Sequence, residues 1–387
     1  MIMRKILSLI LLIFIICGFF IIGVNPVLSS ELVEDSWNTK APMSEARSGL
    51  GVVAVDGKIY AIGGSTIDGT VVGTNECYDP KTDTWTTLTA MPTPRTNFGI
   101  VAYQNKIYCI GGSYSTEYGL LAVEVYDTVT NRWSTKTSMP RRGGTTIRPC
   151  AIDGQIFFTY GGDLFMYDIA ADSWIQKSSM PNFYRSPSYL TVVMDNKLVV
   201  VDAYNFGADT DTAQKVMIYD PKNDQWNKGQ VDPHGGTLAV VTSGVYVPQR
   251  IYIIGTGYDF DTLTFYNSVY DPISNTWSTI KPLPTARDGF GVAVVDDVLY
   301  VIGGYTSDEL LNHYSRTTPV TKVAINEQYV PSDYDHTAKT PEQFLSIPHK
   351  TTQTTFELNR IALITIGLTA IMTVSAVIAL AVKRRKK

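Results

Sequence analysis

The sequence predicts an all-β protein whose main part is a closed ring of six four-stranded blades, a six-bladed β-propeller. A Tyr-Asp pair with a tryptophan six residues after the aspartate occurs five times, first as YDPKTDTW at residues 78–85. Successive tryptophans are separated by 48, 48, 41, 52 and 51 residues, a period typical of propellers and solenoids. Four short apolar segments separated by turns fill each unit, as a four-stranded antiparallel sheet requires.

Each unit also carries the turn residues that such a sheet needs. Asp56-Gly57 and Asp153-Gly154 lie between the first two segments, where a tight hairpin requires positive φ. Paired glycines end the second segment and allow the backbone to approach closely there. These glycines are Gly63, Gly64, Gly111, Gly112, Gly161, Gly162, Gly303 and Gly304. The repeat tryptophans, expected on the outer strands between neighbouring blades, are Trp37, Trp85, Trp133, Trp174, Trp226 and Trp277.

Trp37 indicates how the ring closes. The last unit has a candidate third strand, TKVAINEQYV, with no tryptophan after it, while Trp37 has no blade of its own. Asp35 stands two residues before Trp37, as Asp or Asn does before the other five tryptophans. We therefore expect the N-terminal segment to supply the outer strand of the last blade, which leaves no open sheet edge in the ring.

The combination of apolar strand, Gly-Gly, Tyr-Asp, Trp and then Met-Pro, often followed by Arg, resembles the kelch repeat. The resemblance covers roughly residues 33–330. It implies one blade per repeat around a central channel. Asp202-Ala203 and Gly255-Thr256 replace the glycine pair in the fourth and fifth units, so we expect those blades to be distorted.

Both ends of the chain have the composition of membrane-targeting segments. Residues 1–30 contain a basic start and a 19-residue apolar run, which predicts a secretory signal peptide or an uncleaved signal anchor. Residues 361–382 are uncharged and are followed by the basic tail 383–387, which predicts a transmembrane helix with a cytoplasmic C-terminus. We therefore expect a propeller over 31–330, a stalk over 331–360, and a single-pass protein of the cell membrane with its propeller on the extracellular face.

Charge and cysteine content exclude some functions. Residues 31–360 contain all 36 acidic residues, and the seven basic residues outside this range leave 25 basic ones, a formal charge of −11. Such a surface repels phosphate backbones, so we expect no nucleic-acid partner. Cys77, Cys109 and Cys150 have no metal-ligand spacing; they are read as buried thiols, with one disulfide as the alternative.

One face of the predicted ring is favoured for recognition. Chain direction places the connections between second and third strands on the same face as the links between blades, and these connections are long and unlike one another. They are rich in tyrosine, which suits protein and carbohydrate surfaces, although such side chains also pack loops together. The candidate ligand-binding tyrosines are Tyr114, Tyr204, Tyr258 and Tyr305.

Arginines in the blade-to-blade links are the second candidate group. Three of them follow a repeat tryptophan by ten residues, and two more lie within one position of that spacing. They are Arg47, Arg95, Arg142, Arg185 and Arg287. At the channel mouth they would hold a carboxylate-bearing ligand through paired hydrogen bonds, or they would form salt bridges between blades.

The function expected from these features is that of a cell-surface module that binds a protein or carbohydrate. No catalytic residue, metal site or cofactor is expected, since His234 and His313 lie on separate predicted loops and no nucleophile-base set is present. The alternative is an exported sugar mutarotase, an activity known among kelch-like propellers, acting on acidic sugars through a general acid-base pair.

Overall fold

The computed structural model describes the propeller and leaves both terminal segments outside its description. The described residues are 32–114, 119–141, 147–181, 189–202, 216–229, 236–255, 258–259, 264–265, 267–306 and 320–338. The predicted signal segment, most of the predicted stalk and the predicted transmembrane helix with its tail therefore lie outside the described residues.

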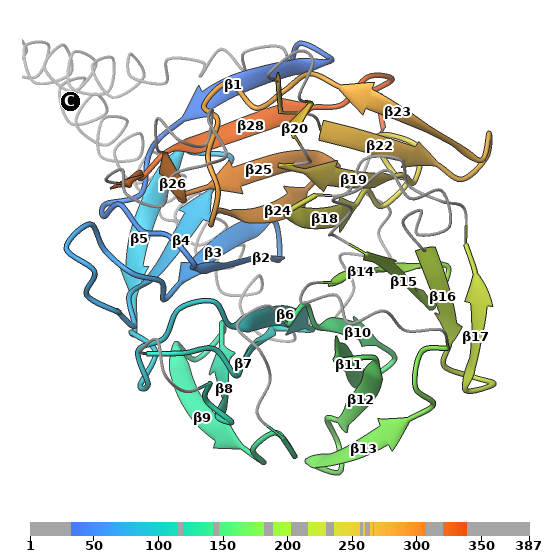
Figure 1. Ribbon diagram of the computed structural model, residues 1–387. Helices are drawn as coiled ribbons and strands as arrows, with labels where there is room; N and C mark the ends of the chain where they lie inside the picture. Colours follow the sequence, from blue (N-terminus) through green and yellow to red (C-terminus); the bar gives the residue numbers. More distant parts are fainter. Residues whose placement is uncertain are drawn as a thin grey trace, which may run out of the picture. The chain divides into compact units, whose positions relative to one another are not determined.

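Six four-stranded antiparallel sheets form the blades (Figure 1). Blade 1 consists of β2 (Gly51–Val55), β3 (Lys58–Ile62), β4 (Asn75–Asp79) and β5 (Thr84–Leu88). Blade 2 consists of β6 (Gly99–Tyr103), β7 (Lys106–Ile110), β8 (Val123–Asp127) and β9 (Arg132–Lys136). Blade 3 consists of β10 (Cys150–Ile152), β11 (Gln155–Tyr160), β12 (Asp163–Asp168) and β13 (Ser173–Lys177).

The remaining three blades follow the same order from the centre outwards. Blade 4 consists of β14 (Tyr189–Met194), β15 (Lys197–Asp202), β16 (Val216–Asp220) and β17 (Gln225–Lys228). Blade 5 consists of β18 (Leu238–Val241), β19 (Ile251–Ile254), β22 (Asn267–Asp271) and β23 (Thr276–Ile280). Blade 6 consists of β24 (Gly291–Val295), β25 (Val298–Ile302), β28 (Asn326–Val330) and β1 (Ser36–Lys40).

Blade 6 confirms the predicted closure of the ring. Its outer strand is β1, which pairs antiparallel with β28 so that Trp37 faces Tyr329. Their rings lie 5.0 Å apart, and the Tyr329 hydroxyl donates to Asp35 at 2.9 Å. The N-terminal strand therefore completes the last blade, and the six-bladed all-β architecture is as predicted.

The repeated Tyr, Asp or Asn, and Trp together staple neighbouring blades. In blade 2 the Tyr126 hydroxyl donates to Asn131 at 2.7 Å, and Asn131 also accepts the main-chain N–H of Thr89 from blade 1. The Trp133 indole donates to the Thr89 carbonyl at 2.8 Å. The outer strand of one blade is thus bonded to the end of the preceding outer strand, which explains why the motif recurs once per blade.

The hydrophobic core is divided among the junctions between blades. In the part of the chain that the structure describes, six clusters of buried apolar side chains occur, one at each junction. The sides of each sheet face two different junctions, so alternate residues of a strand pack on opposite neighbours. Each blade is therefore stabilised by the blades beside it.

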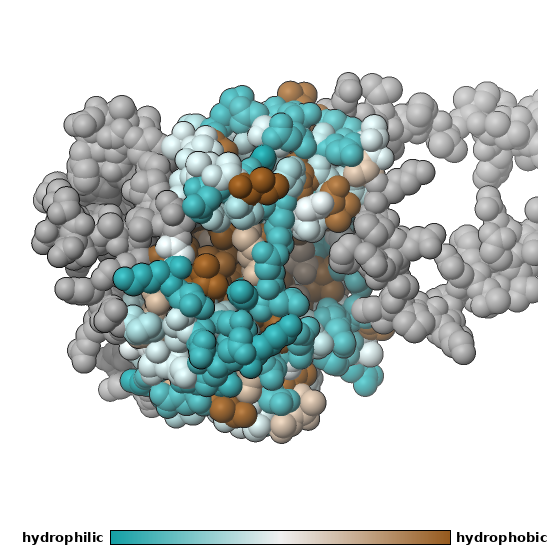
Figure 2. All heavy atoms as spheres, turned by 90° about the vertical axis from the view of Figure 1, so that its right-hand side faces the viewer, coloured by the Kyte–Doolittle hydropathy of each residue, from teal (hydrophilic) through white to brown (hydrophobic). Residues whose placement is uncertain are grey.

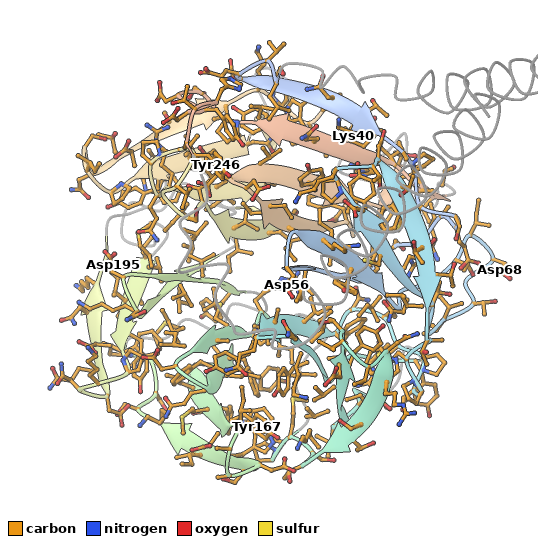
Figure 3. All side chains as sticks on the ribbon, turned by 180° about the vertical axis from the view of Figure 1, so that it is seen from behind. Lys40, Asp56, Asp68, Tyr167, Asp195 and Tyr246 are labelled. Atoms are coloured by element: carbon orange, nitrogen blue, oxygen red, sulfur yellow. The ribbon has the colours of Figure 1, made fainter. Side chains whose placement is uncertain are left out.

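The ring has two unlike faces. The loop face carries the links between blades and the connections between second and third strands; the turn face carries the other two connections of each blade. Figure 3 shows Asp56, in the β2–β3 turn, near the centre of the ring and Asp68, in the β3–β4 connection, at its outer edge. Loop-face connections in blades 5 and 6 include small ribbons: β20 (Tyr258–Asp259) with β21 (Thr264–Phe265), and β26 (Tyr305–Thr306) with β27 (Thr321–Lys322).

On the turn face, an enlarged hairpin of blade 5 binds to blade 6. Residues 242–250 join β18 to β19, and the buried carboxylate of Asp297 accepts main-chain N–H groups from Ser243, Val245, Tyr246 and Val247. The last three bonds measure 3.0, 2.8 and 3.3 Å. The hairpin is therefore a bridge between two blades, with Val247 in the core cluster of the junction between blades 6 and 1.

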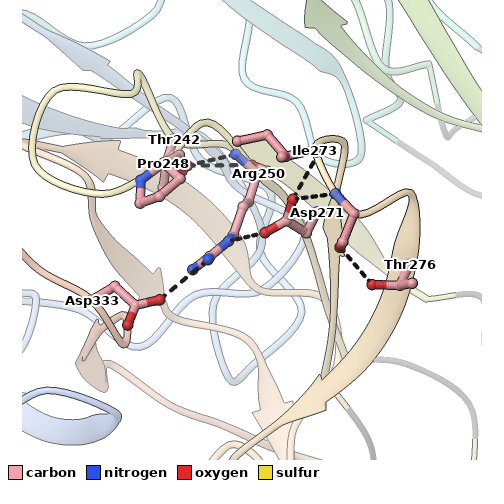
Figure 4. A network of polar contacts seen from close by, with 8 residues as sticks. Thr242, Pro248, Arg250, Asp271, Ile273, Thr276 and Asp333 are labelled. Carbon is pink, nitrogen blue, oxygen red and sulfur yellow. Dashed lines mark hydrogen bonds and ion pairs between the residues drawn. The ribbon is translucent and has the colours of Figure 1, made fainter.

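Residues after β28 also pack on this hairpin. The Tyr334 ring stacks on Tyr246 with centroids 5.5 Å apart, and Arg250 binds Asp271 and Asp333 at 3.1 and 3.2 Å (Figure 4). Residues 331–337, which the sequence assigned to the stalk, thus contact the propeller. Contacts divide the chain into units 1–337 and 338–387.

Both described ends of the propeller leave from the turn face. Ser36, the first residue of β1, is paired with Val330, the last residue of β28, and the Asp333 N–H donates to Glu34. Within the described ranges, no helix is long and apolar enough to cross a membrane.

Figure 2 shows the outer wall near blades 4 and 5, where hydrophilic residues cover most of the described surface.

Candidate functional site

The three link arginines that the structure describes are buried. Arg47 and Arg95 have no exposed surface and Arg287 has 5%. Each forms a salt bridge with a glutamate two residues before the repeat tyrosine of its own blade: Arg47 with Glu76, Arg95 with Glu124, and Arg287 with Glu327. Burial lowers the pKa of Arg47 and Arg287, an effect that the glutamate charge opposes.

These guanidinium groups also donate to main-chain carbonyls. Arg95 donates to Gly111 and Ala122, both at 3.1 Å, while its own carbonyl accepts the N–H of Gly64 from blade 1 at 2.9 Å. Its side chain is thus bound within blade 2 and its main chain bonds blade 1. These contacts are structural, but the expectation of salt bridges between neighbouring blades is wrong for the three described arginines: each salt bridge lies within one blade, and the main-chain carbonyls of Arg47 and Arg95 bond the neighbouring blade instead. Having no exposed face for a ligand, they have no part in the function proposed below.

The other predicted ligand-binding residues have different placements. Arg142, Arg185 and Tyr204 lie outside the described residues. The backbone of Tyr258 lies in β20. Tyr114 is 60% exposed at the start of the blade 2 connection. Tyr305 is partly buried, and its hydroxyl donates to Asp288 at 3.2 Å.

Links of neighbouring blades bond to one another through the backbone on this face. Gly49 donates to the Gly289 carbonyl at 2.8 Å, and Asn97 donates to the Gly49 carbonyl at 2.7 Å. All three residues have positive φ, between 52° and 64°. A Cβ on Gly49 would lie 2.2 Å from the Thr96 hydroxyl. Glycine at this position therefore permits a continuous belt of hydrogen bonds across blades 6, 1 and 2.

Arg148, which the sequence reasoning missed, is an arginine of another kind. It lies just before the inner strand β10 of blade 3, and its Nε has no hydrogen-bond partner. Burial lowers its pKa to about 10, and the opposing charge is that of Asp288 in blade 6. Blades 3 and 6 are opposite in a ring of six, and the interaction between the two charges indicates that both residues border the mouth of the central channel. A signal existed: Arg148 stands where inner strands of blades 1, 2 and 6 begin with Gly51, Gly99 and Gly291.

Asp288 and Tyr305 form the opposite side of this mouth. Their main chains exchange two hydrogen bonds, of 3.0 and 2.8 Å. Burial, with the nearby Asp288 charge, raises the pKa of Tyr305 to about 12, so its phenol is protonated at neutral pH. The mouth thus presents a cationic side and an anionic side with a hydroxyl donor.

Apolar side chains are exposed on the connections of three successive blades. They are Val320, Ile67 and Tyr114, in blades 6, 1 and 2. Lys322 joins the first two connections by donating to the Ser65 hydroxyl at 2.8 Å. Exposed apolar and aromatic residues on a rigid support are typical of recognition surfaces.

Potential metal-ligating side chains do not cluster in the described part of the chain, and its thiols are buried. No group of three or more His, Cys, Asp or Glu residues able to hold a metal occurs there. Cys77, Cys109 and Cys150 are free and buried, and burial raises the pKa of the latter two to about 12. The reading of these cysteines as buried thiols is confirmed for this structure.

The sequence is similar to kelch motifs and to several kelch-like proteins. The family model of the Kelch motif matches residues 46–92, 94–140 and 286–317. The chain contains kelch motifs. Kelch-like protein terF of Aspergillus terreus is 33% identical over 145 residues, covering 36% of this chain and 31% of that protein. Kelch-like protein 26 of Danio rerio is 33% identical over 222 residues, covering 52% and 34%.

The matches span only part of these relatives. Beta-scruin of Limulus polyphemus is 29% identical over 171 residues, which is 42% of this chain and 18% of that protein. Among solved structures, one titled "Structure of YjhT" has a TM-score of 0.54 at 14% identity, covering 74% of this chain and 95% of the other. That likeness shows the fold alone. The kelch motifs suggest a protein-interaction module.

Proposed function

We propose that this protein is a cell-surface interaction module whose kelch propeller binds a protein or carbohydrate ligand through its loop face. Residues 361–382 would anchor the chain in the cell membrane with the propeller outside and the C-terminus in the cytoplasm. The bilayer is then one partner, and the ligand outside the cell is the other.

The observation that carries this proposal is the opposite placement of the chain ends and the variable loops. Ser36 and Val330 are paired at the turn face, so the segments leading to residues 1–31 and 338–387 start from there. The connections that differ between blades lie on the loop face. Tethering through the turn face would leave the loop face free to meet a ligand.

A binding experiment can separate the two faces. The ectodomain would be applied to peptide and glycan arrays as wild type, as Ile67→Asp and as Ile273→Asp. Ile67 is 67% exposed on the loop face and Ile273 is 86% exposed on the turn face, so each substitution adds the same charge at an exposed isoleucine. We expect the loop-face substitution to weaken binding and the turn-face substitution to leave it unchanged. Binding lost only with Ile273→Asp, or no binding at all, would overturn the proposal.

Membrane topology has its own test. Epitopes placed within residues 339–360 and after Lys387 of the full chain would be probed on intact and on permeabilised cells. Antibody should reach the first epitope on intact cells and the second only after permeabilisation. The reverse pattern contradicts the proposed orientation.

A mutarotase acting on acidic sugars is the second candidate, and the channel mouth is the observation that favours it. Arg148 offers a cation for a sugar carboxylate, while Asp288 and the protonated Tyr305 offer an acid-base pair. NMR exchange measurements on sialic acid anomers would detect the activity. Wild-type protein that leaves the uncatalysed exchange rate unchanged excludes this candidate.

A further inference from the structure

Blade 3 has the shortest connection on the loop face. In blades 1, 2, 4, 5 and 6 at least twelve residues join the second and third strands. In blade 3 the connection between β11 and β12 consists of Gly161-Gly162 alone. We call Tyr160–Asp163 the loop-free sector, since blade 3 has no residues there with which to build a rim.

The glycine pair of blade 3 also serves a different purpose from the others. Strand pairing shows that Tyr160, and not Gly161, occupies the position in blade 3 that Gly63 occupies in blade 1. A Cβ on Gly63 would lie 2.7 Å from the Arg95 carbonyl, whereas one on Gly161 would have no atom within 4 Å. Gly161 and Gly162, with φ of 57° and 85°, form a two-residue hairpin turn. The expectation of close backbone approach is therefore wrong for Gly161, which borders open space.

Polar and aromatic side chains surround this turn. The Arg141 guanidinium lies 5.2 Å from the centre of the Tyr160 ring and binds Asp163 at 2.8 Å. Asp163 also accepts from Gln176 and Ser179. Arg141 keeps about half of its side chain exposed. This arrangement is a rigid platform with a cationic upper surface.

Arg148, in the link that leads into the same blade, has no glutamate partner of the kind that Arg47, Arg95 and Arg287 have. Two residues before the repeat tyrosine, blades 1, 2 and 6 have Glu76, Glu124 and Glu327, but blade 3 has Phe165. No carboxylate of its own blade is available at that position; the Nε of Arg148, like that of Arg47, has no hydrogen-bond partner, and Arg148 as a whole is partly exposed. Because Arg148 is partly exposed, an incoming carboxylate can reach its guanidinium and form a charge-assisted pair.

We propose that the loop-free sector admits an extended acidic polypeptide, and that Arg148 at the channel mouth binds one of its carboxylates. The proposal rests on the proposed function, because it requires the loop face to be the binding surface. Arg141 and Tyr160 would lie beneath the peptide as it crosses blade 3.

The opposite side of the mouth favours a polypeptide as the occupant. Asp288 can accept a donor but would repel a second anion, so the ligand must carry a carboxylate and a hydrogen-bond donor together. A peptide provides both within one or two residues, from an acidic side chain or its C-terminus and from its backbone N–H. An acidic sugar has similar groups and is distinguished in the test.

The test uses the full chain in detergent micelles and fluorescein-labelled hexaglutamate, with fluorescence anisotropy as the readout. We expect saturable binding that weakens about tenfold or more in Arg148→Gln, since one charge-assisted pair is lost. Arg132→Gln, which removes an equal charge from the exposed outer strand β9, should bind as wild type. Inserting Ser-Asn-Gly-Ser between Gly161 and Gly162 should also weaken binding, because it gives blade 3 a loop.

The other outcomes overturn the inference in distinguishable ways. Equal affinity in Arg148→Gln and Arg132→Gln shows a general charge effect and removes Arg148 from the site. Displacement by free sialic acid, with no preference for hexaglutamate over hexaglutamine, replaces the polypeptide with a sugar. If hexaglutamate fails to bind while array binding still depends on Ile67, the inference fails and the proposed function survives. If hexaglutamate does not bind and array binding does not depend on Ile67, the inference and the proposed function both fail.

Discussion

In blades 6, 1 and 2 a buried link arginine meets a glutamate of the third strand, whereas blades 3, 4 and 5 have Phe165, Met217 and Ser268 at that strand position. The Kelch motif model matches segments of blades 1, 2 and 6 only. Both halves nevertheless keep the Tyr, Asp or Asn, and Trp staple, except that in blade 5 the Trp277 indole has no hydrogen-bond partner. Blade geometry thus depends on the staple, while the arginine pair determines how the link is held on the loop face.

The largest effect is expected from breaking one arginine pair. Glu124→Leu would leave Arg95 buried without its carboxylate, and we expect a loss of about 3–5 kcal/mol in the free energy of unfolding. Urea denaturation measures it. Adding Arg95→Met should restore most of the loss, because the uncompensated charge is removed. A cost below about 1 kcal/mol for the single change would mean that blade 2 does not depend on this pair.

A somewhat smaller effect is expected where the two halves meet at blades 5 and 6. Asp297→Ala would remove the carboxylate that accepts four main-chain N–H groups of the blade 5 hairpin, of which Val245 keeps the Ser243 hydroxyl as a second acceptor. We expect a loss of about 2–4 kcal/mol in the free energy of unfolding. The same denaturation experiment applies. Asp296→Ala is the control, since the structure records only the main-chain carbonyl of that residue as an acceptor, from Tyr334. Equal stability of the two variants would show that the bonds between Asp297 and the hairpin do not stabilise the junction of blades 5 and 6.

The staple allows a finer comparison of the halves. Trp133 donates to the Thr89 carbonyl at 2.8 Å, but the buried indole N–H of Trp277 has no partner. Trp133→Phe should therefore cost about 1 kcal/mol more than Trp277→Phe. Thermal unfolding of the two variants, side by side, measures the difference. Equal losses would show that the indole hydrogen bond contributes nothing to the junction.

The smallest effect concerns acid stability. In blade 3 the Tyr167 hydroxyl lowers the pKa of Asp172, whereas blade 2 has the uncharged Asn131 in the same place. A lowered pKa means that ionised Asp172 stabilises the fold above its unfolded pKa of about 4 and loses this contribution as pH falls. Asp172→Asn should flatten the stability profile below that pH. NMR titration of Tyr167→Phe should show the pKa of Asp172 rising; an unchanged pKa would contradict the assignment.

The fold could be read from the sequence because its signals are local and repeated. The Tyr-Asp and Trp spacing fixed the outer strands, and Asp35 with Trp37 revealed the closure. The partners of the arginines were missed because a pairing between a link and a third strand has no local signal. It does have a pattern across blades, since Glu76, Glu124 and Glu327 all stand two residues before a repeat tyrosine.

The candidate site was harder to predict for the same reason. Arg148 breaks the spacing that selected the other arginines, and its significance depends on Phe165 and Asp288, which are remote in sequence. Gly161-Gly162 looks like the other glycine pairs but is shifted by one residue in the strand pairing. A shift of one residue changes which side chain meets the neighbouring link.

The pairing of β1 with β28 has a consequence for synthesis. Asp35 and Tyr329 are 294 residues apart, so the first strand leaves the ribosome long before its partner exists. Five blades can assemble in turn while that strand waits, and only the final stretch of translation converts an open arc into a ring. Interruption before residue 330 would release an arc with two unpaired edges, a species prone to join with its own kind.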